Sequence, residues 1–252
     1  MNKSFIIPQW PAPASVKAIV TTRQGGYSTP PFDSFNLATH VTDDIAHVTA
    51  NRQLLQSNLP GQPLWLNQLH SNNIVDAAHC AMDSNADGSY STEPNCVSVV
   101  LTADCLPLLL CNQQGTVVAA VHAGWRGLVN GIVEQALTKV MAAGDCSAEQ
   151  LLVWLGPAIG PGKFEVGEDV RQQFLLKSPD SSKVDACFVA LKNNKNKYFA
   201  NLYELARIRI LHQGIENISG GNYCTYTEQQ RFFSYRRNGQ TGRMASLIWL
   251  EK

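Results

Sequence analysis

The sequence lacks any imbalance of charge, because its 20 lysines and arginines equal its 20 aspartates and glutamates. Charged residues make up only 16% of the 252 residues, and they form no basic run. A neutral chain of this kind does not favour nucleic acid or an anionic membrane as the main partner. Any phosphate site must therefore be local, built from a few arginines and backbone amides.

Long apolar runs are also missing, and no stretch approaches the roughly 18 apolar residues that a membrane-spanning helix needs. Residues 1–16 contain only the short apolar run 5–7, so we expect no signal peptide. The seven cysteines have irregular spacing and form no Cys-x-x-Cys pair, which does not indicate a disulfide framework. We expect a cytoplasmic protein with reduced thiols.

Repeats, low-complexity tracts and long linkers are absent as well, so residues 1–252 are predicted to form a single domain. The pattern of apolar residues alternates between strand-like and helix-like segments along the chain. Strands are predicted at residues 17–22, 96–103, 107–111, 116–121, 151–155 and 244–250. Helices are predicted at about residues 44–55, 127–143, 168–176 and 202–213. This order indicates a mixed α/β (α+β) fold, with a central mixed sheet covered by helices.

The middle of the chain is its most apolar part. The three successive strands there carry apolar residues at nearly every position rather than at alternate ones. Such strands are typical of a sheet whose two faces are both covered. The link at residues 112–115 (NQQG) is typical of a hairpin turn.

Polar side chains that can bind a metal stand in three segments next to this apolar part: residues 67–71 (NQLHS), 102–107 (TADCLP) and 122–127 (HAGWRG). Two imidazoles and one thiolate from separate loops would leave a fourth position open, as in catalytic zinc sites. Taken singly, such a histidine is usually a hydrogen-bonded core residue, and such a cysteine a small buried hydrophobe. The spacing alone leaves both interpretations open. His40, His47, His79 and His212 stand in no pattern typical of ligation.

These segments, together with residues 156–160 (GPAIG), resemble the laccase-domain family, also described as multicopper polyphenol oxidases, whose bacterial members are similar to purine nucleoside phosphorylases. The motifs come in family order, with weaker agreement at residues 22–26 and 36–38. The resemblance implies that His70, Cys105 and His122 bind one metal ion.

The resemblance also implies an activity, namely phosphorolysis of adenosine, guanosine, inosine and methylthioadenosine, with adenosine deamination as a second activity. The partners would then be small molecules, a purine nucleoside and phosphate. Zinc is the expected cofactor, and copper is possible because it binds N/S sites tightly. A multicopper oxidase needs roughly ten histidines, whereas this chain has six. The H-x-E and P-C-x-x-C patterns of zinc nucleobase deaminases are absent too.

Candidate site residues follow from these motifs. Arg23 precedes two glycines and is the first candidate for binding phosphate, although a surface role at a turn is as plausible. Asn36 and Arg126 are further candidates for binding substrate, and Arg126 could equally form a salt bridge. Cys105 and His70 are catalytic candidates, joined by Asp104 as a proton carrier or a capping residue of the turn.

Two other segments attract attention. Residues 156–163 look like a phosphate-binding P-loop but lack its spacing and its Ser/Thr, so they are predicted to be a turn in the pocket wall. The aromatic run in residues 232–237 could stack on a base, although packing is the commoner role.

Two rival functions use the same residues. A cysteine hydrolase would employ Cys105 as nucleophile and His122 as base, and some relatives resemble hydrolases that edit peptidoglycan precursors. Alternatively, the metal would only stabilise the fold while the pocket binds a partner. A copper-dependent polyphenol oxidase is a further alternative.

Overall fold

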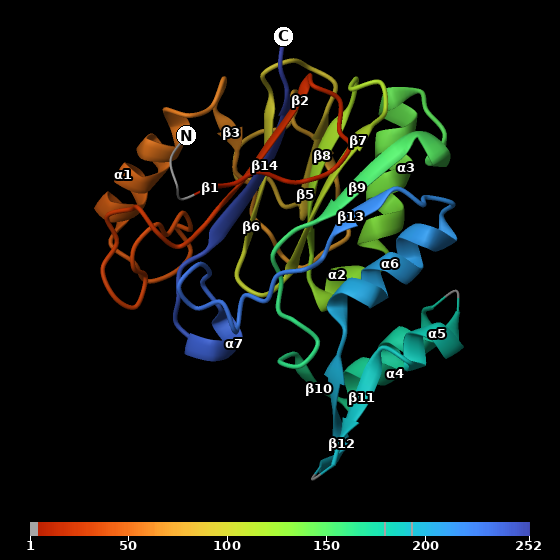
Figure 1. Cartoon of the computed structure of the whole chain (residues 1–252). Coiled ribbons are helices and arrows are strands. Elements are labelled where there is room, and N and C mark those ends of the chain that lie inside the picture. The colour runs from red at the N-terminus through yellow and green to blue at the C-terminus, as the bar shows by residue number, and fades with distance from the viewer. Residues whose placement is uncertain (1–4, 179, 193) are drawn as a thin grey trace.

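Two β-sheets lie face to face at the centre of the molecule, and helices cover their outer sides (Figure 1). The computed structural model describes residues 5–178, 180–192 and 194–252. One sheet has five strands, in the order β1 (Phe5–Ile6), β2 (Val16–Thr21), β14 (Met244–Leu250), β6 (Val97–Thr102) and β3 (Pro63–Leu64). The other has six, in the order β13 (Ile218–Gly220), β9 (Leu151–Leu155), β7 (Leu106–Asn112), β8 (Val118–Ala123), β5 (Gly88–Ser91) and β4 (Val75–Asp76).

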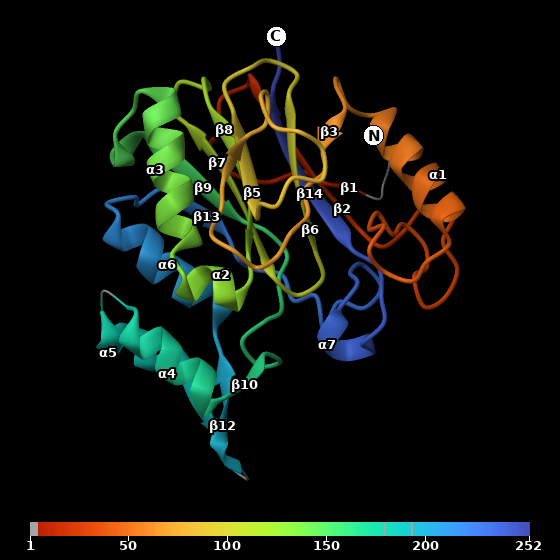
Figure 2. The ribbon, with the colours of Figure 1, turned by 180° about the vertical axis from the view of Figure 1, so that it is seen from behind.

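The helices divide between the two outer faces, as the view from behind also shows (Figure 2). The five-stranded sheet is covered by α1 (Ile45–Gln56), whose first turn is capped by the Asp44 carboxylate through the Ala46 N–H. The six-stranded sheet is covered by α2 (Trp125–Val129), α3 (Ile132–Gly144) and α6 (Leu202–His212). A short turn of 3₁₀-helix, η1 (Ala148–Gln150), leads into β9.

This layering explains why the central strands are apolar on both faces. In β7, Leu108 and Leu110 pack toward the helices, whereas Leu109 and Cys111 pack between the two sheets. Burying one such leucine fully stabilises the fold by roughly 1.5–3 kcal/mol. The predicted mixed α/β fold with helices on the sheet faces is confirmed, with two packed sheets in place of one central sheet.

Most predicted elements are confirmed, including the hairpin of β7 and β8. The predicted helix over residues 127–143 is instead two helices, because the chain turns at Asn130 and Gly131. Gly131 has a φ of 85°, a left-handed conformation that glycine adopts without steric cost. The turn allows α2 to end above the sheet edge before α3 crosses the face.

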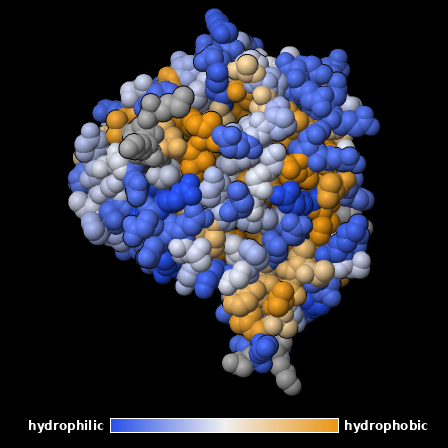
Figure 3. Space-filling model, viewed as in Figure 1, coloured by the Kyte–Doolittle hydropathy of each residue, from blue (hydrophilic) through white to orange (hydrophobic). Residues whose placement is uncertain are grey.

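A third, small sheet was not predicted. It has the order β10 (Glu165–Gly167), β12 (Asn194–Ala200) and β11 (Phe188–Leu191), and it packs on α4 (Glu168–Leu176) beside α5 (Ser181–Asp185). This arm extends away from the two large sheets (Figure 1). Its outer face is hydrophobic (Figure 3), with the side chain of Val189 largely exposed there.

The remaining helix is α7 (Tyr235–Asn238), which lies near the arm. Its Arg236 guanidinium donates to the backbone carbonyl of Glu165 in β10, at 2.7 Å. This bond links the C-terminal segment to the arm. In the part of the chain that the structure describes, no helix has both the length and the apolar character needed to cross a membrane.

Candidate metal centre

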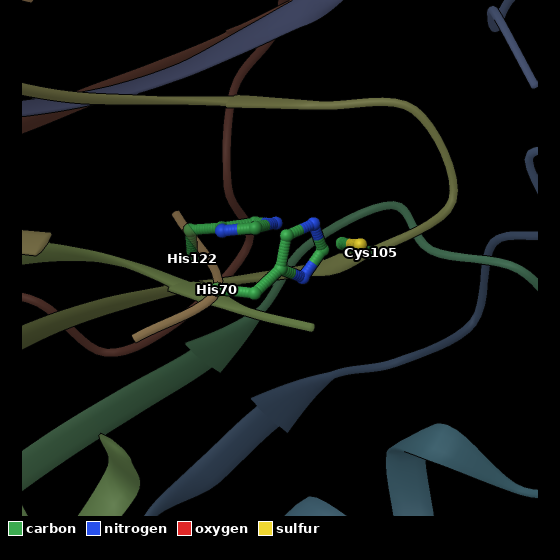
Figure 4. Close-up of side chains that lie close together, drawn as sticks. All are labelled: His70, Cys105 and His122. Atoms are coloured by element: carbon green, nitrogen blue, oxygen red, sulfur yellow. The ribbon is translucent and has the colours of Figure 1, made fainter. Parts of the chain in front are cut away.

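The structure brings the three predicted metal ligands together. His70 lies in the loop between β3 and β4, Cys105 lies between β6 and β7, and His122 lies in β8. The ligand atoms of the three side chains are all within 4.8 Å of one another. Figure 4 shows the side chains pointing toward a common centre.

Asp87 orients this group, and sequence reasoning missed it. Its Oδ1 accepts a hydrogen bond from His122 Nδ1 at 2.7 Å, which leaves Nε2 as the ring nitrogen that can bind a metal. The carboxylate also accepts the backbone N–H groups of Leu69, His70 and Ser71, and the Ser71 hydroxyl. One fully buried carboxylate therefore holds both the His122 ring and the loop that carries His70.

The hydrogen bonds decide the charge of Asp87. Burial alone would raise the pKa of the Asp87 carboxyl, but the hydrogen bonds from His122 and Ser71 lower it below its usual range. The side chain is therefore an anion, and it accepts these bonds as one.

The two histidines differ in their electrostatics. Burial and the neighbouring His122 lower the pKa of His70, which favours the neutral imidazole that binds metals. Burial would also lower the pKa of His122, but the Cys105 thiolate and Asp87 raise it to about 9. The potential at His122 is thus negative, which is the potential that favours a cation.

Two further features fit a bound cation. Nδ1 of His70 is buried and has no hydrogen-bond partner among the residues described. Gly124 leaves space there, because a Cβ at this position would lie 2.6 Å from His70 Nδ1 and 3.2 Å from Cys105 Sγ. Two imidazoles and a thiolate suit zinc or copper. The residues fit such an ion, and metal binding by them stays a prediction.

The three ligands line a cavity of about 380 Å³, here called the metal cavity. Its apolar wall includes Leu101, Ala103, Trp125, Ile159 and Phe164. Its cationic side chains are Arg126, Arg236 and Arg243, and His40 lines it as well. A cavity with this mixture of surfaces suits a flat, partly apolar molecule together with an anion.

Asp104 also lines the metal cavity, but its carboxylate is engaged within the wall. Oδ1 accepts from the Thr225 hydroxyl and Oδ2 from the Arg236 backbone N–H, both at 2.6 Å. Asp104 has a φ of 90°, a conformation that costs energy for a residue with a Cβ. Its side chain thus holds the start of α7 against the Cys105 loop, and its role as a proton carrier stays a prediction.

The three predicted substrate-binding residues are separated in the structure. Arg126 lines the metal cavity, with its guanidinium 4.3 Å from the centre of the Trp125 ring. Asn36 is fully buried outside the cavity, and its Oδ1 accepts the backbone N–H of Arg243 at 3.0 Å. Arg23 lines a different cavity, here called the Arg23 cavity, together with Asp33 and Arg237.

Arg23 is fully engaged where it lies. Its guanidinium donates to the backbone carbonyls of Asp33 and Gln229 and forms an ion pair with the Asp33 carboxylate at 2.9 Å. The predicted phosphate ligand is thus absent from the lining of the metal cavity, because bonds to Asp33 and Gln229 hold Arg23 in the other cavity.

The two other segments have clear structural roles. The Ile159 N–H of the GPAIG turn donates to the Asp104 carbonyl, and Ile159 lines the metal cavity as a wall residue, as predicted. Phe232 and Phe233 are fully buried in or beside the core, whereas Tyr235 is exposed and lines the cavity. The two phenylalanines of the aromatic run therefore pack in the interior, and its tyrosine contributes to the cavity wall.

Comparison with known proteins places these features in a family. The family model described as "Multi-copper polyphenol oxidoreductase laccase" matches residues 17–251. The chain is 48% identical to "Purine nucleoside phosphorylase YfiH" of Escherichia coli (strain K12), over 98% of each chain. It is 46% identical to "Purine nucleoside phosphorylase PA4543" of Pseudomonas aeruginosa, over 98% of this chain and 99% of the relative.

Solved structures agree with the fold over nearly the whole chain. Protein NMB0706 of Neisseria meningitidis superposes with a TM-score of 0.91 at 42% identity, over 99% of this chain and 100% of the other. YlmD of Geobacillus stearothermophilus superposes with a TM-score of 0.86 at 29% identity, over 95% of this chain and 93% of the other.

Proposed function

The chain belongs to the family described as multi-copper polyphenol oxidoreductase laccase, and from this membership we propose that it is a metal-dependent purine nucleoside phosphorylase. The observation that carries the proposal is the group of His70, Cys105 and His122 inside a cavity with a cationic wall. The names of relatives such as that of Escherichia coli support the reaction class. The proposed substrates are adenosine, guanosine, inosine and methylthioadenosine, with deamination of adenosine as a second activity.

Phosphorolysis makes defined demands on the cavity. A phosphate oxygen forms a bond to ribose C1′ while the bond from C1′ to purine N9 breaks, and the departing base takes the electron pair and then a proton. Cationic side chains such as Arg126 would hold the phosphate. The apolar wall with Trp125 and Phe164 would hold the purine.

The ligand group defines what a metal would add. His70, Cys105 and His122 would hold a divalent ion, zinc by preference and copper as the alternative. When bound, the ion supplies a Lewis acid that polarises a substrate oxygen or a water molecule. Asp87 keeps the proton of His122 on Nδ1 and thereby keeps Nε2 available.

One observation favours a second candidate, a cysteine hydrolase that acts on an amide such as a peptidoglycan precursor. The sulfur of Cys105 and a ring nitrogen of His122 lie within 4.8 Å of each other, as a nucleophile and its base require. Cys105 would attack the carbonyl, and His122 would deliver a proton to the departing amine. Metal removal separates the candidates, because chelation would abolish the phosphorylase and spare the free thiol.

Copper-dependent oxidation of polyphenols has less support. It would need further coppers to receive electrons. Within the described ranges, His70, Cys105 and His122 form the one group of three or more histidine, cysteine or acidic side chains placed to hold a metal ion.

The decisive experiment is a product assay with purified protein of measured metal content, given adenosine with and without phosphate. Ribose 1-phosphate and adenine, formed only with phosphate and lost on chelation, are the expected products. Inosine in both conditions would support deamination alone. If neither product forms, the phosphorylase proposal is wrong and the hydrolase is favoured.

A further inference from the structure

The arginines of the metal cavity point to a binding site for an oxyanion. Three arginines line the cavity, and Asp104, the acidic residue in its lining, has both carboxylate oxygens engaged inside the wall. The cavity therefore presents a positive surface beside the ligand group. An anion in this place would meet guanidinium groups rather than carboxylates.

Arg243 and Arg126 are two arginines of the cavity that keep N–H groups available, and Arg126 stacks on Trp125. Arg243 Nη1 donates to the backbone carbonyls of Thr241 and Gly242, at 2.8 and 3.1 Å. Among the residues that the structure describes, its other two nitrogens have no hydrogen-bond partner, and the guanidinium lies 6.0 Å from the centre of the Tyr235 ring. The half-buried Arg243 side chain lines the cavity, so these N–H groups are available to an anion there.

His40 lines the same cavity as Arg243 and can donate a hydrogen bond as a neutral imidazole. Burial lowers the pKa of His40, and the charges of Arg243 and Arg52 lower it further, which favours this neutral form. Arg52 is tied to the wall through its bond to the Leu37 carbonyl and its stacking on Trp65. His40 and Arg243 are the two of this group that line the cavity.

The backbone of Arg243 is fixed by a buried polar network. Asn36 accepts the Arg243 N–H through Oδ1, and its Nδ2 donates to Asp43 Oδ2 at 2.8 Å. Gly242 lets these segments approach, because a Cβ there would lie 2.9 Å from Asn36 Cβ. The Asn36 side chain also bonds to the backbone of Ala38, two residues before His40, so the network positions Arg243 and the loop of His40.

We propose that Arg243, together with His40, binds the phosphate co-substrate beside the metal ligands, and that Asn36 positions Arg243 for this task. The assignment rests on the proposed phosphorylase function and replaces Arg23 as the phosphate ligand. Asn36 then acts through the backbone of Arg243 and does not touch the substrate.

The test compares Arg243→Met with a matched variant, Arg23→Met, in the metal-loaded protein. Orthophosphate binding is measured directly, without nucleoside, by titration calorimetry, and the KM for phosphate is measured during turnover. Arg243→Met should weaken phosphate binding by about 10- to 100-fold, with the KM for nucleoside changed by less than about twofold. Arg243→Lys should recover part of the loss, and Arg23→Met should leave phosphate affinity unchanged.

Asn36→Ala should raise the KM for phosphate and leave the KM for nucleoside unchanged, which a general loss of structure would not do. Unchanged phosphate affinity in Arg243→Met, or a loss in Arg23→Met alone, would overturn the assignment. Binding of adenosine 5′-monophosphate without any binding of orthophosphate would overturn it as well, in favour of a phosphate ester. Phosphate binding through Arg243 without phosphorolysis would sink the proposed function and leave the anion site in place.

Discussion

The metal cavity and the Arg23 cavity share α7 and are both lined by arginines, yet their polar groups are used differently. In the Arg23 cavity, Arg23 and Arg237 donate to backbone carbonyls and to Asp33, so their hydrogen-bonding capacity is filled by the chain itself. In the metal cavity, His70 Nδ1 is buried without a partner among the described residues. A side chain whose hydrogen-bonding groups all have partners within the chain has a structural role. A buried side chain with an unpaired hydrogen-bonding atom indicates a place for a ligand.

The largest expected effect tests whether the side chains of the metal cavity bind a metal ion. Cys105→Ala removes one of three metal ligands and should weaken zinc binding by about 3 kcal/mol, more than a hundredfold. The fold should persist, because the side chain is only half-buried in a loop. Metal analysis and circular dichroism measure both, and stoichiometric zinc in the dialysed variant would contradict the ligand assignment.

Asp87→Asn should lower both the stability of the fold and the affinity for zinc. The Asp87 carboxylate is fully hydrogen-bonded within the chain, and it also orients the proposed metal ligands. Zinc affinity should fall by about 10- to 100-fold as His122 loses its orienting anion. The fold should lose about 2–3 kcal/mol at pH 7, because the bonds to a charged acceptor weaken. Metal titration and urea unfolding check the two effects, and a variant with wild-type zinc affinity would remove Asp87 from the site.

The same variant has a pH signature. Hydrogen bonds lower the pKa of folded Asp87 below its ordinary value of 3.8, so its contribution to stability is complete above that value. The contribution disappears as the pH falls through the lowered pKa. The difference in unfolding free energy between wild type and Asp87→Asn should therefore be largest at neutral pH and shrink below about pH 4. A difference that grows in acid would refute this.

Arg23→Met should have a smaller effect, confined to stability. Loss of its bonds to Asp33 and Gln229 should cost about 1–2 kcal/mol, since they are partly exposed to solvent. Thermal unfolding measures this loss. Zinc content should stay at the wild-type level, and a variant that loses zinc would break the distinction between the two cavities.

The smallest effect is expected at His79, which lies outside both cavities. Its side chain is 78% exposed and contacts only the neighbouring Asp76 carboxylate. His79→Gln should change stability by less than about 0.5 kcal/mol and leave metal content as it is. Loss of zinc here would mean that the wrong histidine has been assigned.

His70, Cys105 and His122 could be predicted as metal ligands because they stand in sequence motifs that resemble a known family, such as HAGWRG around His122. The sequence also predicted the central strands, whose apolar runs leave little choice of structure. The small sheet of the arm escaped prediction, since four of the seven residues of β12 are asparagine or lysine and only its last three form an apolar run.

Asp87 and Arg243 escaped prediction for a different reason. Asp87 precedes Gly88, a pair typical of turns, and its partner His122 is 35 residues away. Arg243 is connected to Asn36 across 207 residues. Only the folded chain reveals such long-range hydrogen bonds. The prediction of Arg23 as the phosphate candidate followed from a local glycine motif, which lacks this information.

The hydrogen bonds of Asp87 would also change the entropy balance of the proposed metal binding. Because they hold the loop of His70 and the ring of His122 through contacts within the chain, the entropy lost in ordering these two ligands belongs to folding. An arriving ion then has little conformational freedom left to remove, so more of its coordination energy appears as affinity. Loading is expected to be limited by dehydration of the ion and its entry through the cavity rather than by rearrangement of the protein.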